Sequence, residues 1–212
     1  MERLKVAVFA SGRGSDFQSL IDARDRGELD VDLVLLVSNR PGAMCIERAK
    51  KAGIDTFVLD HHGMEREEWE ERVEVELRKK GVNFIVLAGF MRLLSASFVS
   101  RWRNKIINIH PALLPSFPGV HAHRDALDYG VKVTGLTIHF VDEKMDHGPV
   151  IFQYPVWVKD DDTEESLSQR VLEQEHIWYP RVLQWIAEGR VEVQGRLVKV
   201  RGITDSERAP WQ

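Results

Sequence analysis

An amide and an imidazole stand at the end of an apolar stretch near the middle of the chain. Residues 106–110 read Ile-Ile-Asn-Ile-His, a β-branched pattern that predicts a buried strand. Pro111 ends this strand, because proline has no N–H to donate to a ladder of hydrogen bonds. Asn108 and His110 are two residues apart, so a strand places both side chains on one face, at the end where open α/β sheets bind ligands. A polar pair that merely caps a strand end fits this stretch equally well.

A carboxylate lies in a short connection between two later strands. Residues 133–141 alternate in polarity and residues 150–158 form another apolar run, which together predict an antiparallel pair. Asp146 falls in the tight part of their connection, where backbone groups can hold a carboxylate and aim it. Beside an imidazole, such a carboxylate would favour the protonated ring and could accept a proton. Taken alone, Asp146 also fits an ordinary Asx turn.

A glycine-rich turn, residues 11–16, joins the first predicted strand to the first predicted helix within a strand–turn–helix–strand unit over residues 6–37. The turn places backbone N–H groups at a helix N-terminus, which suits a phosphate. It is not the dinucleotide fingerprint, because Phe17 occupies the third glycine position and no acidic residue ends the second strand. Arg40 follows that strand and could accommodate the extra phosphate of NADP, so this alternative stays open beside a purely structural turn.

The remaining elements continue the α/β pattern. The expected fold is a Rossmann-like, mostly parallel sheet with helices on both faces and an antiparallel C-terminal extension. We expect a single domain over residues 1–200 and a C-terminal tail over residues 201–212. Further helices are predicted at residues 17–26, 43–52, 66–79, 97–102, 125–129 and 163–188, further strands at residues 56–59 and 83–88, and a hairpin at residues 191–200.

Composition excludes several classes of protein. The 212 residues carry a net charge of −4, so there is no global basic field for nucleic acid, and we expect no nucleic-acid partner. No apolar run approaches the roughly 20 residues of a membrane helix, and the N-terminus does not read as a signal peptide. We therefore expect a cytoplasmic protein that does not bind membranes. Cys45 is the single cysteine, and the eight histidines show no zincin spacing, so we expect no metal.

Four motifs together resemble the folate-dependent formyltransferases, and among them the glycinamide ribonucleotide formyltransferases of purine biosynthesis. The resemblance covers about residues 4–190. It implies transfer of a formyl group from 10-formyltetrahydrofolate, as co-substrate, to the amine of glycinamide ribonucleotide. The motifs are Gly12-x-Gly14-Ser15, Ala88-Gly89-Phe90-Met91-Arg92, Asn108-x-His110-Pro111-x-Leu113-Leu114-Pro115 and Asp146-x-Gly148-Pro149.

The resemblance also implies roles for individual residues. Asn108, His110 and Asp146 match the catalytic positions of the family. One departure concerns Asp16, where the family usually has asparagine, because a carboxylate beside a phosphate is unfavourable unless it faces away. Positions for the ribonucleotide are matched by Gly14, Ser15, Asp16 and Glu175, and positions for the folate by Arg66, Met91, Arg92, Leu93, Leu94 and Asn108.

The chemistry of these residue types fits the implied reaction. An amine that attacks a formyl carbon creates an oxyanion, to which the Asn108 amide and a protonated His110 could donate hydrogen bonds. Asp146, or a water that it holds, could accept the proton of the amine, and no covalent intermediate is needed. We expect small-molecule substrates and a monomer or homodimer.

Three alternatives remain. A tRNA formyltransferase carries a further C-terminal domain and a deformylase a further N-terminal domain, for which we expect no room here. A nucleotide-binding module without chemistry would not require the three polar groups to converge.

Overall fold

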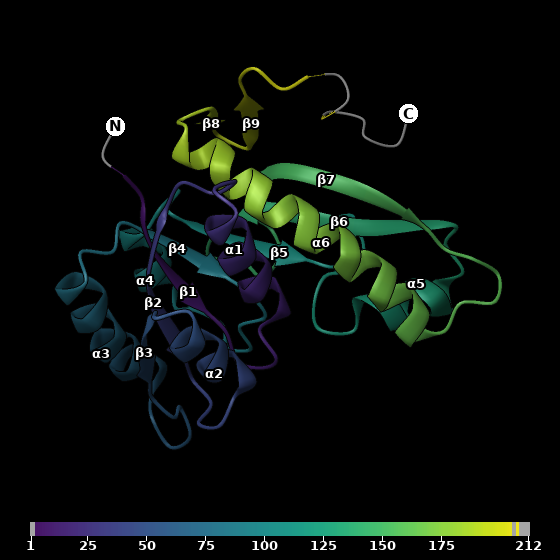
Figure 1. Cartoon of the computed structure of the whole chain (residues 1–212). Coiled ribbons are helices and arrows are strands. Elements are labelled where there is room, and N and C mark those ends of the chain that lie inside the picture. Colours follow the sequence, from purple (N-terminus) through teal and green to yellow (C-terminus); the bar gives the residue numbers. More distant parts are fainter. Residues whose placement is uncertain (1–2, 205–206, 208–212) are drawn as a thin grey trace.

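A seven-stranded sheet in the order β3-β2-β1-β4-β5-β6-β7 forms the centre of the molecule (Figure 1). The computed structural model describes residues 3–204 and 207, so most of the expected C-terminal tail lies outside the described residues. Strands β1 to β5 are parallel, whereas β6 runs antiparallel to β5 and β7 antiparallel to β6. The strands are β1 (Lys5–Phe9), β2 (Asp32–Ser38), β3 (Asp55–Val58), β4 (Phe84–Leu87), β5 (Ile106–His110), β6 (Val133–Phe140) and β7 (Val150–Trp157), with β8 (Val191–Gln194) and β9 (Leu197–Val200) as a separate hairpin.

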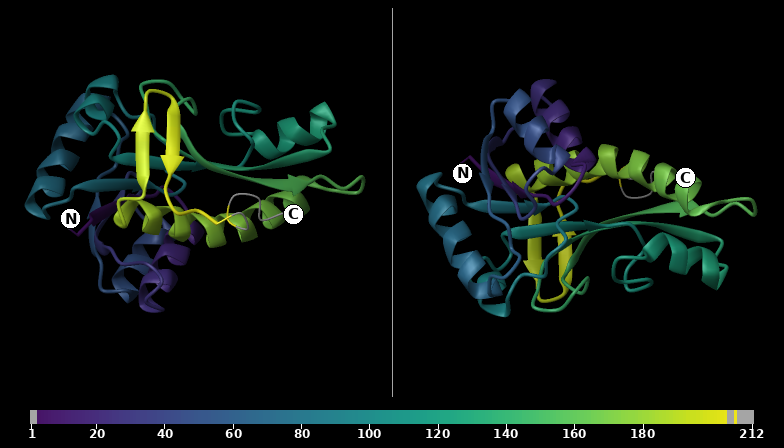
Figure 2. Two further views of the ribbon diagram at one scale, coloured as in Figure 1. Left: turned by 90° about the horizontal axis from the view of Figure 1, so that it is seen from above. Right: turned by 90° about the horizontal axis from the view of Figure 1, so that it is seen from below.

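Helices cover both faces of the sheet, as the alternation of side chains along its strands requires (Figures 1 and 2). Val6 and Val8 of β1 join the apolar core under α1, α2 and α6, whereas Ala7 and Phe9 join the core under α3 and α4. The helices are α1 (Ser15–Asp25), α2 (Met44–Lys51), α3 (Arg66–Lys79), α4 (Ala96–Arg101), α5 (Ala122–Tyr129) and α6 (Glu164–Ala187).

The fold class expected from the sequence is confirmed, and two helix starts differ from the expected positions by more than one residue. Helix α1 begins at Ser15 rather than at residue 17, because Gly14 takes the left-handed conformation (φ 68°) that lets the helix follow at once. Helix α5 begins at Ala122, three residues before the expected start. The first turn of α1 therefore includes Asp16, which the sequence had placed in the preceding turn.

Helix α6 is the longest helix. It contacts α1 on the parallel part of the sheet and also the antiparallel strands β6 and β7. Its start is stabilised by a capping box, in which Thr163 and Ser166 exchange side-chain and backbone hydrogen bonds. Near its end, the buried Tyr179 hydroxyl donates to the carbonyl oxygen of Leu87 in β4 at 2.7 Å. In the part of the chain that the structure describes, neither α6 nor any other helix is long and apolar enough to cross a membrane.

Replacing Tyr179 by phenylalanine tests this attachment of α6 to the sheet. The substitution keeps the ring but removes the donor to the Leu87 carbonyl, and leaving a buried acceptor unsatisfied costs about 1–3 kcal/mol. We expect urea unfolding to show a loss of that order. Tyr129→Phe is the matched control, because Tyr129 is 79% exposed and should give no measurable change. Equal unfolding midpoints for the two variants would show that the Tyr179 hydroxyl contributes nothing.

Candidate active site

Three polar side chains converge at the edge of the sheet where β5 ends. Asn108 and His110 lie on β5, and Asp146 lies in the connection from β6 to β7. The Nδ1 atom of His110 is 3.5 Å from Oδ2 of Asp146, and both side chains are almost fully buried. Asp146 has a left-handed backbone (φ 49°), which aspartate adopts more readily than most residues. The local turn therefore aims the carboxylate at the histidine.

The loop after Pro115 lies against this pair and bonds both members. The Nε2–H group of His110 donates to the carbonyl oxygen of Phe117 at 2.8 Å. The backbone N–H of Gly119 donates to Oδ2 of Asp146, also at 2.8 Å. Because a carbonyl oxygen only accepts, Nε2 of His110 must carry a proton, and Nδ1 is the nitrogen that faces the carboxylate. Both ring nitrogens of His110 are thus engaged in this structure.

His139 is a member of the site that the sequence analysis missed. It lies on β6 directly opposite Asn108, and its Nε2 atom is 3.3 Å from the Asn108 amide nitrogen. Its Nδ1–H group donates to the carbonyl oxygen of Phe140 at 2.9 Å, so Nε2 is free to accept. Burial lowers the pKa of His139, which favours this neutral form. A polar residue within an apolar strand was the available signal, but only the strand register places it beside Asn108.

One amide proton of Asn108 is therefore held by His139, which orients the amide plane and leaves its second N–H available. Oδ1 of Asp146 is 4.0 Å from Nε2 of His139, so the four side chains form one polar group. The Asn108 amide, held by the neutral His139, can donate a hydrogen bond to a developing oxyanion. The imidazole of His110 and the carboxylate of Asp146 can move a proton.

The glycine-rich turn faces a second part of the same sheet edge. Gly14 precedes α1, whose first N–H groups have no partner within the helix. Gly14 is closely packed, because a Cβ atom there would lie 2.6 Å from Cβ of Cys45. Cys45 is buried, and burial raises the pKa of its thiol, as expected for a cysteine that packs rather than reacts. A cavity of about 260 Å³ opens over the turn and is lined by Ser11, Gly12, Arg13, Gly14, Ser15, Asp16, Arg40, Ala88, Gly89 and Met91.

Two of the residues matched to the ribonucleotide are acidic, and the packing of α6 on α1 brings them within electrostatic range. Glu175 of α6 is only 6% exposed, and burial, reinforced by the charge of Asp16, raises its pKa well above the usual range. Burial also raises the pKa of Asp16 to about 6. Among the described residues, the Glu175 carboxyl makes no hydrogen bond or ion pair. Glu175 is thus a mostly buried carboxyl group that is favoured in its neutral form.

The residues matched to the folate lie on the loop that follows β4, except Arg66 at the start of α3 and Asn108 on β5. The Arg92 guanidinium donates to the carbonyl oxygens of Met64 at 3.1 Å and His61 at 3.4 Å, and it lies over the ring of Trp69. Arg66 is exposed at the start of α3, and the structure does not join it to Arg92. The apolar members are accessible to a ligand to different degrees: Met91 and Leu93 are each 54% exposed and Leu94 is half-buried.

A chain of hydrogen bonds links this loop to the glycine-rich turn. The backbone N–H of Met91 donates to the Ser11 hydroxyl at 2.7 Å, and that hydroxyl donates to Oδ1 of Asn39 at 2.5 Å. The Asn39 amide nitrogen is in turn 3.1 Å from Nδ1 of His61. Ser11 and Asn39 are buried, so the positions of the turn and the loop depend on each other.

Within the described part of the chain, one group of side chains has the spacing of metal ligands, and it lies outside this site. Asp60, His61 and His62 follow β3, with Nδ1 of His62 bonded to Asp60 at 2.6 Å. Nδ1 of His61 is already used by Asn39. The expectation that the protein needs no metal stays a prediction.

The mostly parallel sheet, the helices on both of its faces and the polar groups gathered where its strands end place the chain among the doubly wound α/β proteins. The chain belongs to the formyl transferase family, because the model of that family, described as "Formyl transferase", matches residues 4–183.

Individual relatives narrow this assignment. The chain is 40% identical over 210 residues to the phosphoribosylglycinamide formyltransferase of Escherichia coli (strain K12), covering 99% of this chain and 97% of that protein. It is 47% identical to part of the trifunctional purine biosynthetic protein adenosine-3 of Gallus gallus, but it spans only 19% of that protein's length. The crystal structure of glycinamide ribonucleotide transformylase 1 from Symbiobacterium toebii superimposes with a TM-score of 0.91 at 38% identity, covering 93% of this chain and 94% of that one.

Adding one methyl group at Gly14 tests the packing beneath the glycine-rich turn. Gly14→Ala forces a Cβ atom against Cys45 and leaves alanine in a left-handed backbone, which together should cost about 2–4 kcal/mol. We expect a lower midpoint of thermal unfolding. Gly12→Ala is the control, because nothing lies within 4 Å of a Cβ atom there and the substitution should be tolerated. If the two variants were equally stable, Gly14 would be required for ligand approach rather than for packing.

Proposed function

We propose that this chain transfers the formyl group of 10-formyltetrahydrofolate to the amine of glycinamide ribonucleotide, giving formylglycinamide ribonucleotide in purine biosynthesis. The observation that carries the proposal is the convergence of His110 and Asp146 at 3.5 Å beside Asn108, in a chain of the formyl transferase family. Support for this acceptor comes from the E. coli relative, which is named phosphoribosylglycinamide formyltransferase and aligns along 99% of the chain.

In this proposal the two substrates meet at the ends of β1, β4 and β5. The ribonucleotide phosphate binds the N–H groups of Gly14 and Ser15 at the start of α1. The ribose hydroxyls pair with the Glu175 carboxyl, which lacks a partner among the described residues. The folate lies along the loop of Met91 and Arg92, next to the same cavity. Because β4 pairs with β5 and places Leu87 beside Asn108, the formyl group can reach the Asn108 amide.

The amine attacks the formyl carbon, and the new C–N bond forms as an oxyanion develops. The free N–H of Asn108 donates to this oxyanion. His110 joins it only when the Phe117 carbonyl leaves Nε2, so substrate binding must move the loop after Pro115. Asp146 accepts the proton lost by the amine, directly or through a water. The bond from the formyl carbon to the folate nitrogen then breaks, and that nitrogen takes up a proton.

Purified protein with both substrates provides the direct test. We expect formylglycinamide ribonucleotide to appear at the rate at which 10-formyltetrahydrofolate disappears, measured by mass spectrometry of the nucleotide. Release of formate without formylated nucleotide would instead indicate a deformylase. Binding of the nucleotide without turnover would indicate a binding module.

Asn108→Ala tests the oxyanion role. Loss of one such donor costs about 10²- to 10³-fold in turnover. Affinity for the ribonucleotide should change much less, because the donor acts mainly after attack. Single-turnover rates and ligand affinities measured in parallel would show this separation. Asn83→Ala is the control: it removes an amide that bonds the Lys5 N–H at the opposite end of β1, and it should leave turnover unchanged. Parental turnover in Asn108→Ala would refute the role.

Asp146→Asn tests the charge beside His110. The substitution keeps the size of the side chain and an acceptor for the Gly119 N–H, but it removes the carboxylate that favours a protonated imidazole. We expect turnover to fall by about 10²-fold or more. Asp142→Asn in the same connection is the control, because that carboxylate bonds His147 and Lys144 rather than His110. Parental turnover in Asp146→Asn would contradict a role for this charge.

A further inference from the structure

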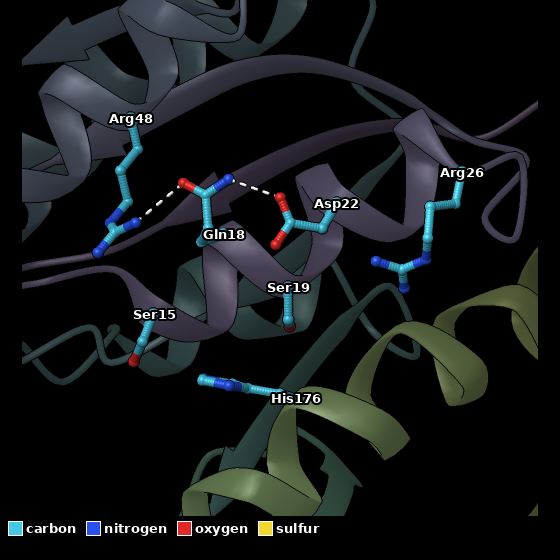
Figure 3. Close-up of a pocket in the computed structure, with 7 residues that line it drawn as sticks. All are labelled: Ser15, Gln18, Ser19, Asp22, Arg26, Arg48 and His176. Atoms are coloured by element: carbon cyan, nitrogen blue, oxygen red, sulfur yellow. Dashed lines mark hydrogen bonds between the residues drawn. The ribbon is translucent and has the colours of Figure 1, made fainter.

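Two shielded polar atoms face each other between α1 and α6 without a hydrogen bond. Oδ1 of Asp16 and Nε2 of His176 are 3.7 Å apart, and neither atom has a hydrogen-bond partner. Figure 3 shows the His176 ring reaching from α6 toward the first turn of α1, beside Ser15 and Ser19. A carboxyl group and an imidazole at this separation attract each other when they share one proton.

No other cation among the described residues pairs with the Asp16 carboxyl. Arg48 of α2 donates to the side chain of Gln18 and to the carbonyl oxygen of Arg13. Gln18 in turn donates to Asp22, so these groups form a network of their own that does not include Asp16 (Figure 3). The charge of the Asp16 carboxyl must therefore be balanced by its own proton or by that of His176.

Of the other titratable groups that act on the pair, Arg48 is positive and its charge lowers the pKa of His176, whereas the rest add negative or no charge. Glu175 and Tyr179 of α6 are both buried, and their pKa values are raised well above the usual range by burial and by the charge of Asp16, so both are neutral. Glu173 and Asp22 are exposed and act on His176 only through their charge. Burial lowers the pKa of His176 and raises that of Asp16 to about 6. The last proton of the pair is thus lost as the pH rises through about 6.

The charge of the pair matters because Asp16 lies in the turn that faces the phosphate site. With one proton, the pair of Asp16 and His176 has no net charge, whichever group carries the proton. Without it, the pair carries −1 at the α1 N-terminus, where the phosphate would add about −1.5 to −2. Two such charges a few ångströms apart in a partly buried site repel strongly.

We propose that the ribonucleotide binds the protonated form of the Asp16–His176 pair, so that binding at neutral and alkaline pH takes up about one proton. This inference rests on the proposed function, because it requires a phosphate at the start of α1. Below about pH 6 the Asp16 carboxyl is already protonated, and affinity should be independent of this pair. Above that pH, affinity should fall by up to about tenfold per pH unit, which is the limit for uptake of one proton.

Calorimetric titration with glycinamide ribonucleotide provides the test. At pH 7.5, in two buffers of different ionisation enthalpy, the difference in heat gives the number of protons taken up. The phosphate and the amine of the ligand titrate as well, so Asp16→Asn, which has the same size and no charge, supplies the reference. We expect the wild type to take up about 0.5–1 proton more than Asp16→Asn. Between pH 6.5 and 8.5 the affinity of the wild type for the ribonucleotide should fall at least about tenfold more than the affinity of Asp16→Asn.

Asp25→Asn is the matched control, since this exposed carboxylate lies on the same helix and pairs with Arg24 rather than with the Asp16–His176 pair. It should keep the wild-type proton uptake. His176→Asn removes the other half of the pair and leaves the proton to the Asp16 carboxyl alone. The fall in affinity should then begin at a different pH, and an unchanged pH profile would contradict a shared proton. This second variant also tests the inference if Asp16→Asn does not fold.

A ligand-free measurement separates this inference from the proposed function. The folded state binds a proton at Asp16 more tightly than the unfolded chain, so the contribution of Asp16 to stability is lost as pH rises from about 4 to about 6. Asp16→Asn should therefore raise the urea midpoint at pH 8 relative to the wild type more than at pH 4.5. If the wild type and Asp16→Asn both bound the ribonucleotide with equal proton uptake, the inference would be overturned and the proposed function would stand. Absence of ribonucleotide binding at every pH would overturn the proposed function and the inference with it.

Discussion

The pairing of β6 with β5 is the constraint on which the candidate active site depends. This pairing is antiparallel and sets His139 directly opposite Asn108. A shift by one residue would turn His139 to the other face of the sheet, because side chains alternate along a strand. The connection that follows β6 then returns Asp146 to the end of β5, 3.5 Å from His110. The orientation of the amide, the tautomer of His139 and the place of the carboxylate all follow from one register.

Gly148 shows how tightly this connection is held. A Cβ atom at that position would lie 1.8 Å from the carbonyl oxygen of Phe140, so only glycine allows the two strands to approach here. The motif Asp146-x-Gly148 therefore combines two physical requirements. One residue supplies a carboxylate in a left-handed backbone, and the other permits the close contact that aims it.

A second property of the molecule is the burial of acidic groups where α6 packs on α1. Asp16 and Glu175 come from distant parts of the sequence, and both have raised pKa values because burial disfavours their charge. A buried carboxylate is costly unless it takes up a proton or pairs with an opposite charge. Asp16 also lines the cavity of about 260 Å³ at the N-terminus of α1, so its charge faces the place proposed for the phosphate.

The two proposed substrate sites are also joined through the protein. Ser11 receives the Met91 N–H and donates to Asn39, so the turn after β1 and the loop after β4 share one buried set of hydrogen bonds. Because neither side chain can change its partner without leaving a buried group unsatisfied, the two loops keep a constant separation. A transfer reaction needs such a separation, since the amine and the formyl group must meet within bonding distance.

The sequence by itself determined the order of strands and helices, the bounds of α3, and the strand-end placement of Asn108 and His110, because these depend on local apolar periodicity and on proline and glycine. It also indicated the family, through motifs whose spacing is visible along the chain. Only the tertiary structure decided that His139 orients Asn108, that Phe117 and Gly119 bond His110 and Asp146, and that Asp16 faces His176. Those contacts join residues from different elements, and they depend on sheet register and helix packing, which no local pattern contains.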